Sequence, residues 1–567
     1  MQKIELKLKY DVVIIGGGIS GLSSAALFSR AGISCCVLEM DNRPGGYLAG
    51  FRRKDFRFDS AIHWLNNCGP EGLVTKIFKI IGDDYPRAKD QTRIRRFISD
   101  QFDYLVTKNP DELRDQWIQE FPYEKEGILR FFRDAKRIAK SFEKHTNLSR
   151  TMQTMPLFEK ALYGIKMLGF ALPFIPHIRY SGEKLTKGLN RYFKDEKLHK
   201  VFCSEPDMLS CLIPIAWAYS GDFQIPPSGG SQAFPEWLLY TTEQMGNNVF
   251  FKCKAQQILL ENNIVTGVRF DHRGTLHDVK CNYVIAACDV ETLYEKMLPV
   301  EAVPMKLKDK LKGAKLYASA ITVALGLDCP TEELGFGEEI IYLADTNVPR
   351  EELDSGNPHT SGIHILASSV RDKTLALKEH GTMTIFIPAW IHNNNYWGCE
   401  VDENGNYIRG EKYEQLKKEY ADVLIKRVED KIAPGLSKHI LYCDVATPIT
   451  HWRYTGNKNG TMMAAKPGEE NMKARIAHYK TPVKNLLLSG HWAELGGGIP
   501  LAIKAAVNTT LMVLQKEKKS VFNLYANYMD GKIGVDELKK STLLKHYDNS
   551  WIQELSPAQK KEAREIK

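Results

Sequence analysis

A short apolar run followed at once by a glycine-rich turn and a helix constrains this chain more than any other feature. Residues 10–15 are almost wholly apolar and rich in Val and Ile, which is typical of a parallel strand buried on both faces. The glycine-rich residues 16–21 come next, and a helical stretch then runs to Gly32, a residue type that commonly ends helices. A second strand over residues 34–39 closes the unit. This order predicts the start of a nucleotide-binding α/β sheet.

The glycine spacing in this turn is that of a dinucleotide site. The first two glycines of Gly16-x-Gly18-x-x-Gly21 allow a tight turn and a close approach to a diphosphate, and the third lets helix and strand pack closely. Backbone N–H groups at the helix start favour the negative charge. Glu39, at the end of the second strand, can accept hydrogen bonds from ribose hydroxyls. The residues expected to contact the dinucleotide here are Gly16, Gly18, Ile19, Ser20, Gly21, Glu39 and Met40.

Two further glycine-rich segments favour FAD over NAD. Residues 43–46 read RPGG and let another loop lie against the cofactor, which an NAD dehydrogenase needs less. Residues 486–490 read LLLSG, and residues 496–500 read GGGIP and open a helix. The N-terminus of that helix can point at the flavin pyrimidine ring, which gains negative charge on reduction; a plain glycine-rich linker is the alternative. The cofactor-binding set therefore also includes Arg43, Gly45, Gly46, Ala255, Gly490, Gly497, Gly498, Ile499 and Pro500.

The whole chain is expected to be α/β: a Rossmann-like FAD-binding domain interleaved with an α+β substrate domain and a helical region that contacts a membrane in one interpretation. The FAD-binding domain is assigned to residues 1–85, 225–300 and 480–520, the substrate-binding domain to residues 86–224 and 301–479, and a peripheral helical tail to residues 521–567.

Periodicity gives a coarse view of the remaining elements. Residues 86–224 have helical spacing and little strand character, whereas residues 249–289 form β-rich runs separated by two turn signals. Residues 315–479 mix strands with one long charged helix near 411–432. Residues 391–397 are polar and aromatic, as a pocket rim is, but a plain surface loop is the favoured interpretation.

One segment is unusually apolar for a helix that faces solvent. The first twenty or so residues of the segment 156–180 carry charges only at Glu159, Lys160 and Lys166. The favoured interpretation is a buried core helix broken at Pro173 and Pro176. The alternative is a surface helix that dips into a membrane.

Composition excludes several function classes. The net charge is +8, but the 77 basic and 69 acidic residues are spread along the chain without aromatic interleaving, so nucleic acid is not an expected partner and a mildly basic face towards anionic lipid fits better. Eleven cysteines without a CxxC pair argue against a disulfide framework and a zinc ribbon, and no metal site is expected. With no secretory region and no apolar run of roughly 20 residues, the expected location is cytoplasmic, with peripheral membrane contact left open.

Several blocks of this sequence resemble one family, the phytoene desaturases, carotenoid isomerases and retinol saturases, within the amine-oxidase-like flavoproteins. The blocks are DVVIIGGGISGLSSAALFSRAGISCCVLEMDNRPGG, FRFDSAIHWL with Phe58, Asp59 and His63, PPSGGSQAFPEWL, YVIAACD, and LLLSGHWAELGGGIPLAIKAA, in the order that the family has them. The resemblance implies FAD-dependent chemistry on the carbon–carbon double bonds of a hydrophobic polyene. It also implies an apolar tunnel that reaches the flavin, with NAD(P)H left open as an electron source.

Two departures from the family pattern affect the choice among its members. His491 stands where an Asp is often found, and Ala61 replaces a usual glycine. Flavin itself exchanges the electrons, so a side chain is needed only for the proton. The candidates are Glu494, His491 and His63. The pattern favours the saturase and isomerase branch, and the direction of the reaction stays open.

Two other functions share the same cofactor turn. An FAD-dependent amine oxidase would need an aromatic cage for a neutral amine, and no such pair is identifiable in the sequence. A prenyl-binding scaffold of the escort-protein type would perform no redox chemistry, and the intact Glu39 and GGGIP segments argue against it.

Overall fold

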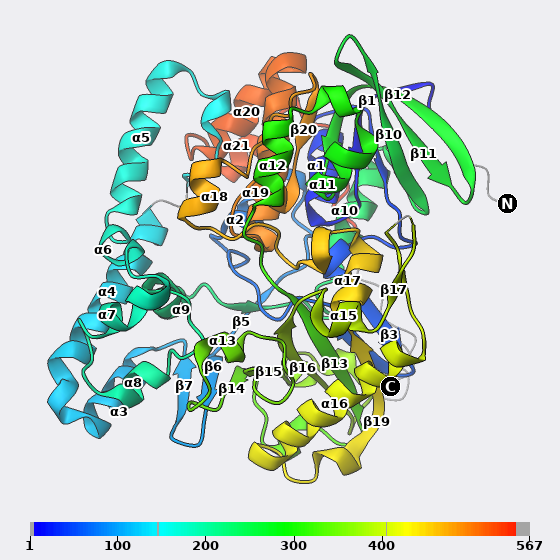
Figure 1. The fold of residues 1–567 in the computed structure, drawn as a ribbon. Helices are drawn as coiled ribbons and strands as arrows, with labels where there is room; N and C mark the ends of the chain where they lie inside the picture. Colours follow the sequence, from blue (N-terminus) through cyan, green and yellow to red (C-terminus); the bar gives the residue numbers. More distant parts are fainter. Residues whose placement is uncertain (1–4, 145–146, 404, 552–567) are drawn as a thin grey trace, which may run out of the picture.

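The computed structural model describes residues 5–144, 147–403 and 405–551, and they are arranged around two large β-sheets (Figure 1). The first sheet holds the N-terminal strand β1 (Lys9–Ile15) and runs in the order β10-β11-β12-β1-β2-β9, with β20 beside β12. Its other strands are β2 (Cys35–Leu38), β9 (Asn248–Phe250), β10 (Cys253–Glu261), β11 (Ile264–His272), β12 (Thr275–Ala286) and β20 (Leu486–Leu488). The α/β class with a Rossmann-like sheet is confirmed.

The parallel half of this sheet is built as its apolar sequence predicts. Strand β1 pairs in parallel with both β12 and β2, and residues 12–15 are buried. The adjacent β10-β11-β12 meander turns at Asn262–Asn263 and again at Arg273–Gly274, all with positive φ. Positive φ at both central residues suits two-residue hairpin turns, so the predicted meander is confirmed.

Helices cover the first sheet and share its core. They are α1 (Ile19–Arg30), α2 (Leu73–Ile81), α10 (Ala233–Gln244), α11 (Val290–Thr292), α12 (Met305–Lys312), α19 (Gly498–Glu517), α20 (Lys519–Met529) and α21 (Val535–Lys539). Among the described residues, α19 is the one helix long and apolar enough to cross a membrane, but 72% of its apolar window is buried in the protein. Helix α19 is therefore a core helix. Helix α20 also sends Val521, Phe522 and Tyr525 into this core, so this part of the predicted peripheral tail packs tightly against the first sheet's helices.

The second sheet runs in the order β19-β13-β16-β15-β14-β6-β7 and lies below the first in Figure 1. Its strands are β6 (Arg93–Ile98), β7 (Asp103–Thr107), β13 (Ser319–Leu327), β14 (Ile340–Leu343), β15 (Ile363–Leu366), β16 (Gly381–Ala389) and β19 (Ile440–Ala446). Helix α16 (Glu411–Lys431), which was predicted near 411–432, packs on this sheet, with α17 (Pro448–Thr455) following β19. Short two-stranded pairs join β3 (Gly50–Arg53) to β4 (Phe56–Asp59), β5 (Lys89–Asp90) to β8 (Gln224–Ile225), and β17 (Glu400–Val401) to β18 (Tyr407–Ile408).

The prediction that residues 86–224 have little strand character was wrong in part, because β6 and β7 form one edge of the second sheet. The sequence of β6, RIRRFI, hides its strand character because three of its six residues are arginines. All three arginines pair with acidic partners: Arg93 with Glu339 at 2.7 Å, Arg95 with Glu205 at 3.5 Å, and Arg96 with Asp103 at 2.6 Å. Tertiary pairing, rather than local pattern, sets this strand.

The rest of this region is helical, as predicted. Its helices are α3 (Asp111–Glu120), α4 (Lys125–Lys144), α5 (Leu157–Ala171), α6 (Ile175–Ile178), α7 (Leu185–Leu189), α8 (Glu196–Lys200) and α9 (Met208–Tyr219). Helices α3, α4 and α9 enclose an aromatic core around Trp117. The favoured interpretation of residues 156–180 as a buried core helix was wrong: α5 has no buried residue, and it forms the upper left edge of the molecule in Figure 1.

Four further α-helices among the described residues are short. They are α13 (Arg350–Leu353), α14 (Ser368–Arg371), α15 (Asn393–Trp397) and α18 (Glu469–Ala474). Within α15, Asn394, Asn395 and Tyr396 have positive φ, so this is a left-handed turn, while Trp397 is fully buried in the core of the second sheet. Residues 391–397 do not line the cavity described below, which agrees with a loop rather than a pocket rim.

Candidate active site

The glycine turn before α1 is shaped by close backbone contacts at two of its three positions. A Cβ atom on Gly21 would lie 2.0 Å from the Gly16 carbonyl oxygen, and one on Gly16 would lie 2.6 Å from that of Ala287. Gly18 differs, because a Cβ atom there would have no neighbour within 4 Å and its φ is −73°. The protein itself therefore does not require glycine at 18, whereas a ligand that approaches the backbone does.

Helix α1 starts at this turn without a side-chain cap, so its first N–H groups remain available to an anion. Glu39 lies beside the turn and is 8% exposed. Its Oε2 accepts a hydrogen bond from the N–H of Gly17 at 2.5 Å, and its Oε1 accepts one from Asp41 at 2.7 Å. Burial raises the pKa of this carboxyl group. Each oxygen keeps a further lone pair, which a ribose hydroxyl can use.

The RPGG loop lies directly against the glycine turn. The N–H of Gly45 donates to the carbonyl of Gly17 at 2.8 Å, and both Gly45 and Gly46 have positive φ. Arg43 takes a different part from the one predicted: its guanidinium donates to the Gly50 carbonyl and lies 3.6 Å from Asp41. It does not line the cavity, so it holds the loop rather than offering a contact to a ligand.

The C-terminal glycine segment meets the same turn from the other side. The hydroxyl groups of Ser20 and Ser489 are hydrogen-bonded at 2.8 Å across 469 residues of sequence. Helix α19 starts at Gly498, is preceded by Gly497 with positive φ, and has no side-chain cap. Its free N–H groups therefore open towards the space that the first turn borders.

These segments border one large cavity of about 2860 Å³. We call one end the dinucleotide end; the predicted residues that line it are Gly16, Gly18, Ile19, Ser20, Glu39, Met40, Gly45, Gly46, Ala255, Gly490, Gly497, Gly498, Ile499 and Pro500. Of the predicted cofactor set, Gly21 and Arg43 are not among the lining residues. Ligand pockets usually measure about 300–1,000 Å³, so this cavity has room for a dinucleotide and a second long molecule.

The other end, which we call the apolar end, is walled by side chains from the second sheet, from the helical region and from the loop after β4. Its lining includes Tyr163, Met167 and Phe170 of α5, Ile213 and Trp217 of α9, Ser319 of β13, Phe386 of β16, and His63 and His364. Ser319 is 4% exposed, and its hydroxyl has no hydrogen-bond partner among the described residues. A buried hydroxyl without a partner is costly, so a ligand is a natural partner for it.

His63 belongs to a stack of three rings at the apolar end. Its imidazole stacks on Phe386 at 4.1 Å between ring centroids and 12° between planes, and Phe386 stacks on His364 at 4.8 Å and 9°. The buried Arg371 donates to the carbonyl oxygen of His63. The three rings are nearly parallel and uncharged, so their flat faces can hold a planar conjugated ligand. Sequence analysis missed Phe386 and His364, which lie in ordinary strand patterns.

Burial governs protonation in this wall. It lowers the pKa of His63 to about 3, with Arg371 adding to the effect, and it lowers the pKa of His491 to about 4. His364 and His451 follow the same trend, with pKa values lowered to about 3 and about 4. The imidazole rings are therefore neutral at pH 7, and neither predicted histidine carries the extra proton of an imidazolium.

Glu494, the third predicted proton donor, is held in a polar network outside the cavity lining. It accepts a hydrogen bond from the Tyr479 hydroxyl and pairs with Lys504 at 3.2 Å. Asn508 in turn donates to Tyr479 at 3.1 Å. This arrangement suits a positioning role at the start of α19.

A carboxyl group that sequence analysis did not single out does line the cavity. Asp222 accepts hydrogen bonds from the backbone and side chain of Asn67 at 2.5 and 2.9 Å. Burial raises its pKa to about 7. A group with this pKa exchanges a proton readily at neutral pH. Nothing in the local sequence distinguishes it, since the shift comes from burial by distant segments.

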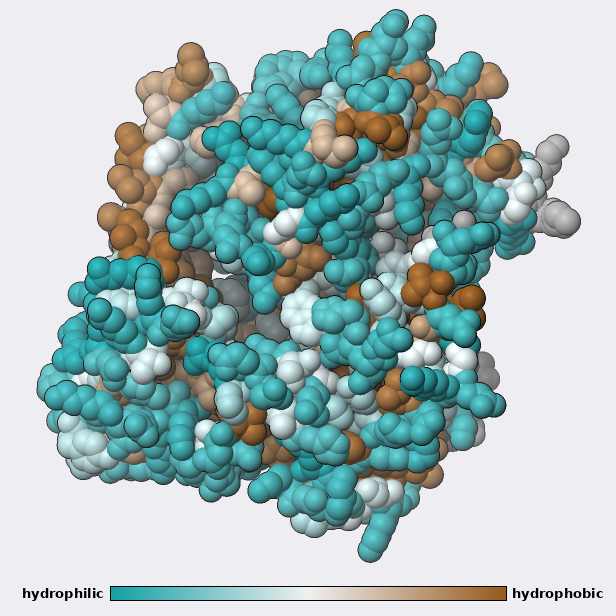
Figure 2. All heavy atoms as spheres, viewed as in Figure 1, coloured by the Kyte–Doolittle hydropathy of each residue, from teal (hydrophilic) through white to brown (hydrophobic). Residues whose placement is uncertain are grey.

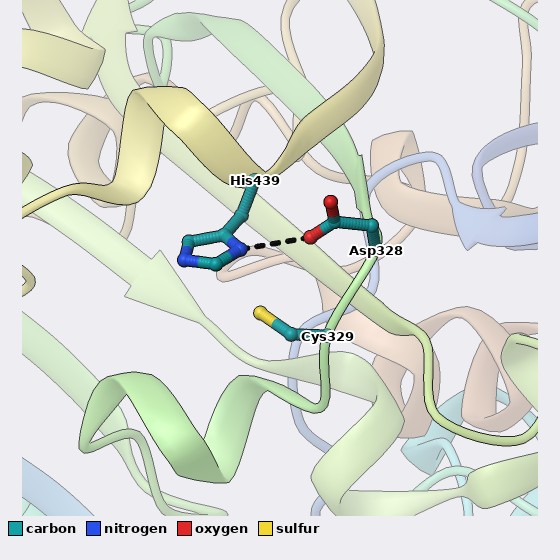
Figure 3. Close-up of side chains that lie close together, drawn as sticks. All are labelled: Asp328, Cys329 and His439. Atoms are coloured by element: carbon teal, nitrogen blue, oxygen red, sulfur yellow. Dashed lines mark hydrogen bonds and ion pairs between the residues drawn. The ribbon is translucent and has the colours of Figure 1, made fainter.

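One cluster with metal-ligand chemistry lies elsewhere. Asp328, Cys329 and His439 bring their ligand atoms within 4.8 Å of one another, and His439 Nδ1 lies 2.8 Å from Asp328 (Figure 3). Asp328 is exposed, and none of the three lines the cavity. The cluster is separate from the candidate active site.

Comparisons with known proteins agree with this geometry. Residues 14–81 match the NAD(P)-binding Rossmann-like domain family. A prolycopene isomerase from an Oncidium hybrid cultivar is 24% identical over 81% of this chain and 76% of its own length. An all-trans-retinol 13,14-reductase from Danio rerio is 24% identical over 86% of this chain and 83% of its own length.

Over most of its length, the chain is similar to members of the phytoene desaturase, carotenoid isomerase and retinol saturase family. The predicted resemblance is thus confirmed, and the chain covers most of the length of both relatives. The fold is that of the amine oxidases: a variant of putrescine oxidase superposes with a TM-score of 0.57 at 14% identity, over 90% of this chain and 100% of its own. A flavin is the class of cofactor that the family and the fold support.

Proposed function

We propose that this protein is an FAD-dependent oxidoreductase that acts on carbon–carbon double bonds of a hydrophobic polyene, a carotenoid or a retinoid-like lipid, as a saturase, isomerase or desaturase. One observation carries the proposal: a single cavity joins a dinucleotide end made of glycine turns to an apolar end made of aromatic and aliphatic side chains. The similarity to a prolycopene isomerase and a retinol reductase supports the same substrate class.

FAD fits the residues that are present. The space beside Gly18 admits a diphosphate at the start of α1, and Glu39 retains acceptor capacity for a ribose. The free N–H groups at the start of α19 suit the electron-rich side of the flavin ring. Bound FAD would supply a ring that takes up or releases an electron pair. For a saturase we propose NAD(P)H as the electron source, whereas an isomerase needs no net electrons.

The side chains of this chain have three tasks. The ring stack of His63, Phe386 and His364 orients a planar ligand, and the apolar wall around it excludes water. Asp222 can hold and deliver a proton at its carboxyl oxygen, because it lines the cavity and its pKa is near neutrality. Neutral His63 and His491 can donate a hydrogen bond through one ring nitrogen and accept one through the other.

The colour of the purified protein tests the first part. Flavin absorption is expected, and a colourless protein that does not bind added FAD would refute the proposal. Incubation with retinol, a poly-cis carotene and phytoene, once with NAD(P)H as electron donor and once with oxygen as electron acceptor, then decides the reaction. A gain of two hydrogens identifies a saturase, no change in mass an isomerase, and a loss of two hydrogens a desaturase.

The same purified protein distinguishes the two alternative functions, an amine oxidase and a prenyl-binding scaffold. An amine oxidase would reduce its flavin when primary amines are added without oxygen, and the polyenes would leave it unchanged. The likeness to putrescine oxidase is one of fold, so it does not favour this outcome. A prenyl-binding scaffold would lack flavin altogether, although it would retain the apolar ligand.

A further inference from the structure

Helix α5 and the short segment after it expose a continuous row of large apolar side chains. The row consists of Leu157 (84% exposed), Phe158 (80%), Leu162 (45%), Ile165 (70%), Leu168 (60%), Leu172 (59%), Ile175 (51%) and Ile178 (60%). Figure 2 shows a brown band along the upper left edge of the molecule, where α5 lies in Figure 1. A contiguous apolar surface of this kind on a folded protein marks an interaction site.

The opposite side of the same helix faces the cavity. Tyr163, Met167 and Phe170 line the apolar end, and Phe170 packs against Phe142 and Phe174 at ring distances of 6.1 and 5.1 Å. Helix α5 is therefore a single-layer wall, with the ligand cavity on one side and the exposed apolar row on the other. A partner that binds the exposed apolar row of α5 therefore lies close to the apolar end of the cavity.

Charge identifies the kind of surface that fits this row. Residues 156–191 contain six Lys or Arg and two Glu. One of the two, Glu159, is already paired with Arg150 and with Lys532. Lys166 is exposed on α5 beside the row, and the exposed Arg179 and Lys184 follow the row in the chain, where they also border the mouth of the cavity. A second copy of the chain would bring these like charges together, whereas anionic lipid headgroups complement them.

We infer that residues 157–178 dock on an anionic lipid bilayer and that an apolar ligand enters the cavity directly from it. An apolar helical face flanked by basic residues lies in the bilayer interface with its apolar side among the acyl chains. The docking is inferred from the exposed surface alone, whereas the entry of a polyene also depends on the proposed function. The route spares an apolar molecule the passage through water.

Vesicle co-sedimentation tests the docking. The wild-type protein is expected to bind phosphatidylcholine vesicles that contain phosphatidylserine, and more weakly those without it. The double variant Ile165→Glu/Leu168→Glu changes two exposed residues that do not line the cavity, so it is expected to lose binding on the order of tenfold or more. The control Leu276→Glu/Leu441→Glu changes two equally apolar exposed residues on β12 and β19 and should bind like the wild type.

Entry is tested with the polyene supplied either in the vesicles or in detergent micelles. The double variant on α5 should lose turnover on the order of tenfold with vesicles and keep it with micelles. Failure of the wild type to bind vesicles, or equal binding by the α5 variant, overturns the docking. A wild-type dimer that the α5 variant makes monomeric, without vesicle binding, assigns the row to a second copy and also overturns it. A wild-type protein that binds vesicles but has no flavin or no turnover refutes the proposed function and leaves the docking supported.

Discussion

The dinucleotide end of the cavity is walled mainly by backbone, whereas the apolar end is walled by side chains. At the dinucleotide end, Gly16 and Gly21 are fixed by carbonyl oxygens 2.6 and 2.0 Å from where a Cβ would lie. At the apolar end, His63 and Phe386 come from segments more than 300 residues apart and meet only through ring stacking. Because close backbone contacts accept few residue types, the dinucleotide end permits few substitutions. The apolar end permits more, since side chains of similar size can replace one another there. The difference predicts that substitutions at the first end affect folding and cofactor retention, and at the second end ligand handling.

The largest effect is expected from Gly21→Ala. The new methyl group would meet the Gly16 carbonyl oxygen, which belongs to the backbone and cannot move aside. We expect a loss of unfolding free energy of about 3 kcal/mol or more, together with loss of bound flavin. Thermal denaturation and flavin absorption measure both. Wild-type stability in this variant would show that the turn is less rigid than described.

A second prediction concerns the proton at the apolar end. Asp222→Asn should lower the turnover of a saturating reaction by about a hundredfold, because it removes a carboxyl group that lines the cavity. Its pKa of about 7 means that the acid form is lost as the pH rises through 7, so wild-type turnover should fall there. Glu494→Gln is the control, since Glu494 does not line the cavity, and its turnover should keep the wild-type pH profile. Equal losses in both variants would contradict a proton-donor role for Asp222.

The third prediction uses the buried histidines around the cavity. Burial lowers the pKa of His451 to about 4, whereas an unfolded histidine has a pKa of about 6.5. The unfolded state therefore binds the proton first, so stability is complete above pH 6.5 and falls as the pH drops towards 4. The loss between pH 7 and pH 5 should be about 2 kcal/mol for each such histidine. His451→Gln should reduce the pH dependence of unfolding by about this amount, whereas replacement of the exposed His546 should not.

Gly18→Ala sharpens the comparison within the dinucleotide end. Its Cβ would meet no protein atom and its φ suits alanine, so the protein without flavin should be as stable as the wild type or slightly more stable. Flavin affinity should fall by about tenfold or more, because the methyl group occupies space beside the diphosphate. Titration of the apoprotein with FAD checks this. Unchanged affinity would mean that the space beside Gly18 is not used by the cofactor.

The smallest effect is expected at the ring stack. Phe386→Leu keeps an apolar side chain of similar size and removes the stacking surface between His63 and His364. We expect a loss of about 1 kcal/mol in ligand binding, seen as a roughly fivefold rise in KM, with flavin content unchanged. A lower flavin content with an unchanged KM would mean that the stack lies at the dinucleotide end and not at the apolar end.

The same contrast explains what could be predicted from sequence. Gly16, Gly18 and Gly21 leave a visible pattern because backbone contact and ligand approach permit glycine and little else. The stack of His63, Phe386 and His364 leaves no pattern, because the second sheet pairs His364 with Phe386 and His63 comes from a distant loop after β4. Helix α5 is apolar on both sides, and periodicity cannot tell whether protein or lipid covers such a helix. Its exposure became visible only once its neighbours were placed.

The hydrogen bond between Ser20 and Ser489 also has a consequence for how the protein is made. Strand β1 and the glycine turn leave the ribosome early, but β20 and the start of α19 follow about 470 residues later. At 5–20 residues per second, this gap lasts roughly 25–95 s. During translation the apolar strand β1 therefore lacks β20 of its sheet for this time, and FAD can be enclosed only after β20 and the start of α19 have been made. During this delay the nascent chain needs protection from aggregation. A chain that terminates before β20 cannot retain the cofactor.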